Sequence, residues 1–146
     1  MKRFTRCISL LLVCVMMLST TAFAAETADP RASNFFAASS VYFWRTSGNN
    51  YQIWFDVTAV GTMAELGTSK IQVQRSTDEV NWTTVRTYYK EDYSQMVDTN
   101  TTHHVDCVSY TATSGYSYRA IVTLYAKNSS GGTGTMREQT AILDLR

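Results

Sequence analysis

The chain has 146 residues with 13 basic and 12 acidic side chains, so its formal net charge is +1 at pH 7. After residue 6 the basic side chains are scattered singly instead of forming a stripe, which excludes nucleic acid as an expected partner. The length suits a single domain of common size.

The first 24 residues have the three-part layout of a secretory signal peptide. Three early cations are followed by an apolar run over residues 7–18 and then by small residues that suit cleavage between Ala24 and Ala25. A retained membrane anchor is the alternative, but crossing a bilayer takes about 20 apolar residues and this run has 12. We therefore expect a secreted, extracellular protein that has no membrane association after cleavage.

Cleavage changes the charge and the cysteine count of the chain. Residues 25–146 lack three of the 13 basic side chains and none of the 12 acidic ones, so the mature net charge becomes −2. Cys7 and Cys14 are also lost, which leaves Cys107 without an intramolecular disulfide partner. A lone thiol outside the cytoplasm is either buried or paired between chains, and the strand-like surroundings of Cys107 favour burial.

The mature chain begins with a segment of small and polar residues. We expect residues 25–40 to be flexible, with Phe35 and Phe36 tucked under the domain, and residues 41–146 to form that domain. The first strand is predicted over Val41–Trp44, ahead of turn residues at 47–50. A second strand follows, in which alternate residues are apolar and face a core: Tyr51, Ile53, Phe55, Val57 and Ala59.

Five more strands are expected beyond a short connection bracketed by Gly61 and Gly67. They cover residues 70–75, 82–89, 102–112, 116–127 and 135–145, with a polar, acidic loop at 90–100 and a hairpin loop at 128–132. In the sixth strand one face is apolar: Tyr118, Ala120, Val122, Leu124 and Ala126. Seven short strands separated by turn signals predict an all-β fold, an antiparallel β-sandwich.

Two segments resemble fibronectin type III and related immunoglobulin-like domains. Tyr118-Arg-Ala-Ile-Val-Thr-Leu-Tyr-Ala126-Lys-Asn128, followed by Gly131-Gly132, is similar to the sixth strand and turn of such domains. Ile71-Gln-Val-Gln-Arg-Ser-Thr-Asp-Glu-Val-Asn-Trp82-Thr-Thr-Val85 is similar to their third strand, turn and fourth strand. The resemblance implies an immunoglobulin-like sandwich in which the Tyr118 ring packs inside and its hydroxyl bonds back to the chain. Tyr116 would point to the same side of the strand and is the competing candidate for this role.

A second resemblance covers nearly the whole mature chain. Its residues, in order, are Val57-Thr-Ala-Val-Gly-Thr-Met63, Leu66-Gly67, Lys70-Ile71, Trp82-Thr-Thr-Val85 and Tyr118-Arg119-Ala120. This order is similar to that of small exported proteins of clostridia-like Gram-positive bacteria. Because that family has no established activity to carry over, the resemblance implies only the fold and the location.

Residue types that ligate metals occur together in one predicted strand. His103 and Cys107 would share one face, and His104 and Asp106 the other. Each face then offers two ligands where a structural zinc site takes four, so we expect no metal and no cofactor. A looser calcium site in the acidic loop at 90–100 stays open as an alternative.

The sequence shows no arrangement of residues that is typical of a catalytic site. The adjacent carboxylates Asp78-Glu79 and Glu91-Asp92 fall in expected turns and are interpreted as solvated charge, not as a glycosidase pair. Cys107 has no base positioned beside it on a strand. We therefore expect that the protein is not an enzyme, with a small exported enzyme as the remaining alternative.

Aromatic residues supply the candidate binding site. Phe, Trp and Tyr make up 16 of the 122 mature residues, and not all of them fit in the core. Trp54 is out of phase with the apolar row of its strand, and Tyr42 and Trp44 lie on the same outer side if Val41 and Phe43 face inward. We predict that this patch recognises an extracellular protein partner. A carbohydrate- or cell-wall-binding module and simple cross-strand aromatic pairing are the alternatives.

Overall fold

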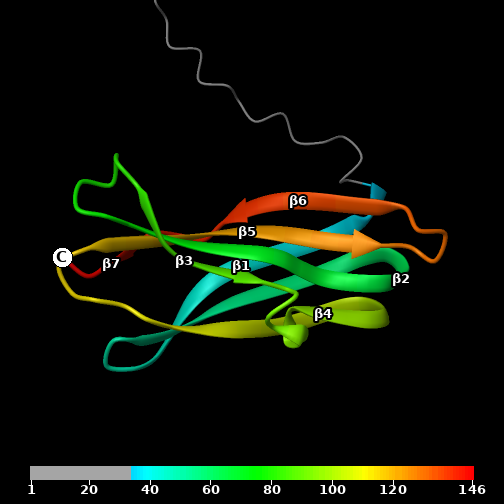
Figure 1. The fold of residues 1–146 in the computed structure, drawn as a ribbon, viewed down its shortest axis with the longest axis horizontal. Helices are drawn as coiled ribbons and strands as arrows, with labels where there is room; N and C mark the ends of the chain where they lie inside the picture. The colour runs from blue at the N-terminus through cyan, green and yellow to red at the C-terminus, as the bar shows by residue number, and fades with distance from the viewer. Residues whose placement is uncertain (1–33) are drawn as a thin grey trace, which may run out of the picture.

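The computed structural model describes residues 34–146, and these residues are almost entirely β-strand (Figure 1). The strands are β1 (Phe36–Ser47), β2 (Asn50–Ser76), β3 (Thr83–Tyr89), β4 (Val97–Thr111), β5 (Ser117–Lys127), β6 (Thr133–Gln139) and β7 (Leu143–Asp144), with one 3₁₀ turn, η2 (Ser94–Met96). Every strand pairing is antiparallel, which confirms the all-β prediction. Within these residues no helix is long and apolar enough to cross a bilayer. The predicted signal peptide and its cleavage site lie outside the described residues.

Strand β2 joins two strands that the sequence pattern separates. The connection expected between Gly61 and Gly67 is itself part of β2, which has 27 residues. Its pairing with β4 shifts register between Thr58 and Met63, and β2 turns back there (Figure 1). Both ends of β2 therefore lie beside the β4–β5 connection: Asn49 O accepts from Ala112 N, and Ser76 pairs with Ser117.

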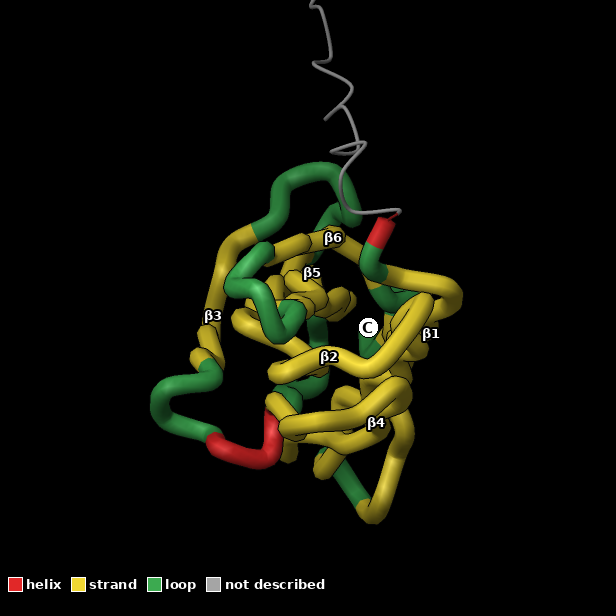
Figure 2. Tube along the Cα trace, turned by 90° about the vertical axis from the view of Figure 1, so that its right-hand side faces the viewer, coloured by secondary structure: helices red, strands yellow, loops and turns green. Residues whose placement is uncertain are grey.

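This turn gives β2 two arms that belong to different layers of one curled sheet. The first arm pairs with β1 and with residues 103–111 of β4, and the second arm pairs with β3 and β5. Residues 97–101 of β4 follow β2 past the turn, and β6 and β7 pair with β5. Seen along the long axis, β5 and β6 lie on the side of the sheet opposite β4, and β1 comes close to β6 at one edge (Figure 2). The sequence predicts seven strands and the structure has seven, but they are not the same seven, because the predicted last strand divides into β6 and β7 at Thr140. Thr140 is buried, and its Oγ1 accepts from Ala120 N at 2.9 Å.

The N-terminal boundary of the domain is earlier than expected. Strand β1 begins at Phe36, where we predicted a flexible segment to residue 40, and Phe36 pairs opposite Ala59. The pattern missed residues 37–40, Ala-Ala-Ser-Ser, because their small side chains give no alternation of large apolar and polar residues, although backbone pairing does not need it. Phe36 belongs to the core and Phe35 packs against that core, as expected. The rest of the predicted segment, residues 25–33, lies outside the described residues.

The predicted inward faces form the core. The alternating residues of the first β2 arm and of β5 are all buried, and Ile71 and Val73 of the second arm face them. Full burial of such aliphatic and aromatic side chains stabilises the fold by about 1.5–3 kcal/mol each. Packing of the two layers against each other is therefore what keeps the sheet curled.

The 90–100 segment is less loop-like than predicted because it packs tightly on β2. It contains η2, and β4 already begins at Val97. Gly67 allows this approach: a Cβ on Gly67 would lie 2.1 Å from Met96 O, and its φ is +153°. Met96 is fully buried, so the short turn carries a core side chain.

Candidate functional site

The predicted aromatic residues lie on the outward side of the layer formed by β1, the first arm of β2, and β4; we call this side the outer face. The strand registers place Tyr42 opposite Trp54, and Trp54 opposite Cys107, so one row of side chains runs across three strands. The next row contains Trp44 and Gln52. The structure therefore brings all three predicted residues together.

The rings of Tyr42 and Trp54 stack on each other. Their centroids are 6.5 Å apart with an interplanar angle of 8°, a cross-strand pair of the kind that stabilises sheets. Tyr42 covers one side of Trp54, and Trp54 is half-buried. The pairing that we considered as an alternative to ligand binding thus exists for these two residues.

Trp44 has different surroundings. It is 61 % exposed, and within residues 34–146 no other ring or cation lies against it. Because a paired strand holds its backbone, an exposed indole here is an ordered apolar surface and not a disordered tail. Among the three predicted residues, Trp44 is the one available to a partner.

The outer face also contains residues that the sequence reasoning did not select. Val105 is 45 % exposed and lies opposite Asp56, and Asp56 Oδ1 is 2.8 Å from His103 Nε2. Odd-numbered residues of β4 face outward. Alternation would therefore have selected Val105 and His103 as outer-face residues if the pairing of β4 with β2 had been known. That pairing joins segments about 50 residues apart, so the sequence pattern alone did not reveal it.

Cys107 lies beside Trp54 and is half-buried, which is less burial than we expected. Burial raises the pKa of its thiol, and the neighbouring Asp106 carboxylate raises it further. A raised pKa disfavours the thiolate, which is the nucleophilic form. The surroundings of this thiol therefore do not activate it.

The two histidines face opposite sides of β4, as the alternation predicts. His104 turns inward: its Nε2 lies 3.0 Å from Gln95 O, and its ring lies 5.6 Å from that of Phe55. His103 is on the outer face with Asp56. No group of three or more His, Cys, Asp or Glu side chains suited to a metal ion occurs in the described part of the chain.

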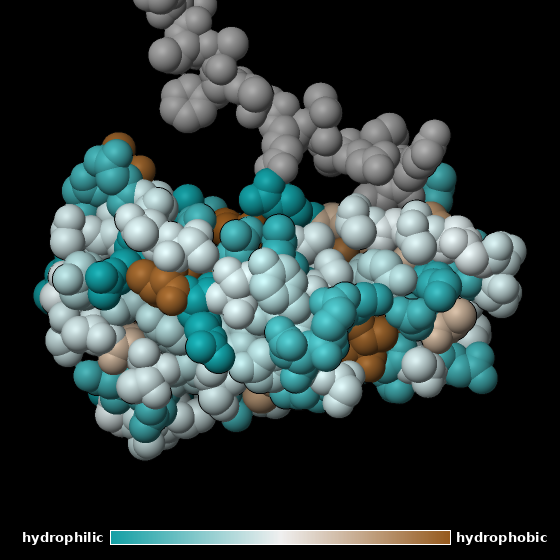
Figure 3. Space-filling view, viewed as in Figure 1, coloured by the Kyte–Doolittle hydropathy of each residue, from teal (hydrophilic) through white to brown (hydrophobic). Residues whose placement is uncertain are grey.

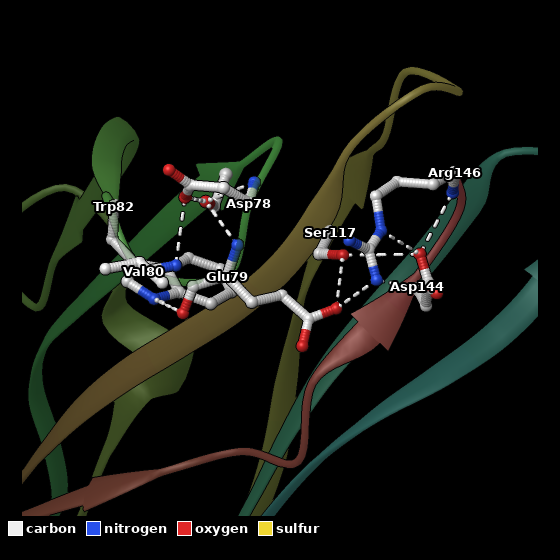
Figure 4. Close-up of polar contacts among 8 residues, drawn as sticks. Asp78, Glu79, Val80, Trp82, Ser117, Asp144 and Arg146 are labelled. Atoms are coloured by element: carbon white, nitrogen blue, oxygen red, sulfur yellow. Dashed lines mark hydrogen bonds and ion pairs between the residues drawn. The ribbon is translucent and has the colours of Figure 1, made fainter.

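The adjacent carboxylates Asp78 and Glu79 have structural roles in the β2–β3 turn (Figure 4). Asp78 Oδ1 accepts from the backbone N–H groups of Val80 and Asn81, and hydrogen bonds with Asn81 hold the Asp78 pKa well below its usual range. Glu79 accepts from Ser117 Oγ at 3.0 Å and pairs with Arg146 at the C-terminus. A carboxyl with a lowered pKa is a poor general acid.

Two aromatic rings on the other layer are already covered by cations, whereas Tyr89 on β3 is 47 % exposed, less than Trp44. The Arg119 guanidinium lies 4.3 Å from the Trp82 ring centroid, and Lys90 Nζ lies 3.9 Å from that of Tyr125. On the face shown in Figure 3, hydrophobic side chains form separate patches in a mostly polar surface. The outer face with Trp44 is therefore the best-supported candidate site for an apolar contact.

No protein-family model, no curated protein and no solved structure matches this chain.

Proposed function

We propose that this protein is a secreted, non-enzymatic recognition domain that binds an extracellular protein partner through its outer face. The observation that carries the proposal is the exposure of Trp44, 61 %, on a strand whose backbone is paired with β2. Tryptophan is enriched among the residues that dominate interface energies. Tyr42, two residues earlier on the same strand and 42 % exposed, extends the apolar surface beside it, and Val105 lies two rows away on β4.

We further propose that the scaffold is a two-layer sandwich of the immunoglobulin or fibronectin type III kind. The strand order β1–β2–β4 in one layer and β3–β2–β5–β6 in the other supports this, with β2 contributing to both. The Tyr118 hydroxyl, which bonds to both backbone groups of Thr113, has the role of a tyrosine corner. Folds of this kind host many functions, so the fold supports a scaffold role and not a particular ligand.

An extracellular location rests on the signal peptide pattern of residues 1–24 and on the resemblance to small exported proteins of clostridia-like Gram-positive bacteria. A non-enzymatic role is favoured because the Asp78 and Glu79 carboxylates are engaged in a turn and the Cys107 pKa is raised.

A protein partner fits the outer face better than a glycan does. Sugar rings stack on exposed aromatic faces, and Tyr42 occupies one face of Trp54. The uncovered Trp44 ring keeps carbohydrate or cell-wall binding as the second candidate.

The test compares Trp44→Ala with Trp54→Ala in capture of partners from a surface extract. Trp44→Ala should reduce capture about 30-fold or more, the size of a hot-spot loss of 2 kcal/mol, with little change in the melting temperature. Val80→Ala is the matched control, since Val80 is 77 % exposed but lies in the β2–β3 turn. Equal capture by wild type and Trp44→Ala would overturn the proposal.

Treatment of the extract separates the two candidate functions. Protease treatment should abolish capture if the partner is a protein, whereas periodate treatment should abolish it if the partner is a glycan. Trp54→Ala should instead lower the free energy of unfolding, since it removes a stacked pair worth about 0.5–1.5 kcal/mol beyond its buried area.

A further inference from the structure

The edges of β3 and β4 face each other without pairing. Each of these strands pairs only with β2 among the described residues, and the two belong to opposite layers. Between them lies a cleft of about 490 Å³, within the size range of sites for small molecules. Strand β3 lies toward the viewer in Figure 1, and β1 lies on the far side.

The walls of this cleft are held in place by hydrogen bonds and core packing. Tyr88 is buried and its hydroxyl donates to Ser109 O at 2.7 Å, which links the two layers. The Tyr93 ring meets the Tyr88 ring edge-on at 5.2 Å, and Tyr93 O accepts from the backbone N–H of the buried Met96. A preformed site avoids the cost of ordering its side chains when a ligand binds.

One cation dominates the charge of the cleft. Arg86 donates from Nη2 to Tyr93 Oη at 3.0 Å, and its guanidinium lies 5.2 Å from the Tyr88 ring centroid. The guanidinium also interacts with the Tyr88 hydroxyl, its side chain is exposed, and none of the residues that line the cleft within residues 34–146 is acidic. A guanidinium held in this way can take a carboxylate in two parallel hydrogen bonds.

The remaining lining is rich in neutral hydrogen-bonding groups. Gln95, Ser109 and Thr111 are exposed at the rim, and Tyr110 lines the wall. Burial, with Tyr118 nearby, raises the pKa of Tyr110 to about 12, so its hydroxyl stays protonated at ordinary pH. Such groups match the hydroxyls of a sugar ring, which donate and accept hydrogen bonds.

An extended peptide is a poorer occupant because the exposed edge of β4 is already capped. Ser109 O is taken by Tyr88, and Cys107 N donates to its neighbour Asp106. Further along the edge, both backbone groups of His103 bond to Thr101 Oγ1. Added strands need a continuous row of unpaired backbone groups, which this edge lacks.

We propose that the β3–β4 cleft binds a sugar that carries a carboxylate, with Arg86 holding the carboxylate and the rim residues holding the ring hydroxyls. Ser109 and Thr111 have the odd-numbered parity of the outer face, so the cleft meets that face at the β4 edge, two strands away from Trp44. Arg86 belongs to β3, in the other layer, and the proposal does not depend on the function proposed for Trp44.

The test titrates the protein with D-glucuronate and follows backbone amides by NMR. Glucuronate should shift the amides of Tyr93, Ser109 and Tyr110. Glucose lacks the carboxylate that would pair with Arg86, and acetate lacks the ring hydroxyls, so each should bind at least about tenfold more weakly. A glucuronate-containing polysaccharide, titrated in parallel, shows whether the site accepts a free sugar or a chain end.

Arg86→Gln should weaken glucuronate binding at least about tenfold, and Arg86→Lys should restore only part of it because lysine keeps the charge and loses the fork. Arg45→Gln is the matched control, since Arg45 is an exposed arginine that donates to Gly48 O in the β1–β2 hairpin. Tyr93→Phe provides a second test if Arg86→Gln does not fold. Unchanged affinity in Arg86→Gln, equal affinity for glucose, or shifts confined to the outer face would each overturn the proposal.

Discussion

At the residue scale, one hydroxyl closes the connection between β4 and β5. Tyr118 is 1 % exposed; its Oη accepts from Thr113 N at 2.9 Å and donates to Thr113 O at 3.0 Å. The sequence pattern left Tyr116 as an equal candidate, since both residues have the same parity. The structure decides for Tyr118: Tyr116 is half-buried, under the Arg75 guanidinium at 4.4 Å.

Tyr118→Phe should therefore destabilise the protein by about 1–2 kcal/mol. It removes two hydrogen bonds, each worth about 0.5–1.5 kcal/mol, while the ring keeps its packing. Urea denaturation measures the change. Tyr116→Phe is the control and should stay within about 0.5 kcal/mol of the wild type. Similar losses in both variants would show that the hydroxyl of Tyr118 has no special role.

At the element scale, Glu65 links the turn-back of β2 to its neighbours. Its carboxylate lies 3.0 Å from Lys127 Nζ on β5 and 3.1 Å from Lys90 Nζ in the segment after β3. Hydrogen bonds from Lys127 and then Lys90 lower the pKa of Glu65 below its ordinary value of 4.5. The folded state therefore favours the ionised carboxylate at the point where β2 passes between layers.

This linkage predicts how stability depends on pH. Because the folded-state pKa of Glu65 is lowered, its contribution is present above the ordinary pKa of 4.5 and is lost as the pH falls through the folded-state value. Glu65→Gln should cost less than about 1 kcal/mol at pH 7, given the partial exposure of the three side chains, and almost nothing at pH 3. Denaturation at both pH values measures this difference, and an equal cost at both would refute the assignment.

At the scale of the whole molecule, the signal peptide that we propose for residues 1–24 would set the mature charge and the compartment. Cleavage after Ala24 would give a chain of net charge −2 whose only cysteine is Cys107. Strand β1 begins at Phe36, so 11 residues would precede the sheet in the exported protein.

N-terminal sequencing of the protein recovered from the medium should therefore begin at Ala25. Ala24→Trp should block processing, because the peptidase requires a small residue at that position, and the uncleaved chain should stay with the cells. The variant Ala37→Ser serves as the control, since Ala37 lies in β1, far from the cleavage site in sequence, and should be processed normally. Release of Ala24→Trp with the same N-terminus would contradict this assignment.

The sequence by itself determined the features that depend on neighbouring residues. Alternation in Tyr51–Ala59 and Tyr118–Ala126 predicted the two main buried faces, and the parity of Trp54 predicted its outward side. The hairpin loop at 128–132 was equally readable, because Gly and Asn adopt turn conformations at low cost. These features depend on residues within one strand or turn, so the sequence of that strand or turn is enough to predict them.

Only the tertiary structure decided which strands meet. The continuity of β2, the cover that Tyr42 gives to Trp54, and the cleft beside Arg86 all depend on pairings between segments distant in the chain. Alternation shows that a face is buried but not which residues bury it. In the structure, two of the three predicted aromatic residues stack on each other and the third is exposed. The physical reason is that exposure is set by neighbours in space, and in a curled antiparallel sheet those neighbours are rarely neighbours in sequence.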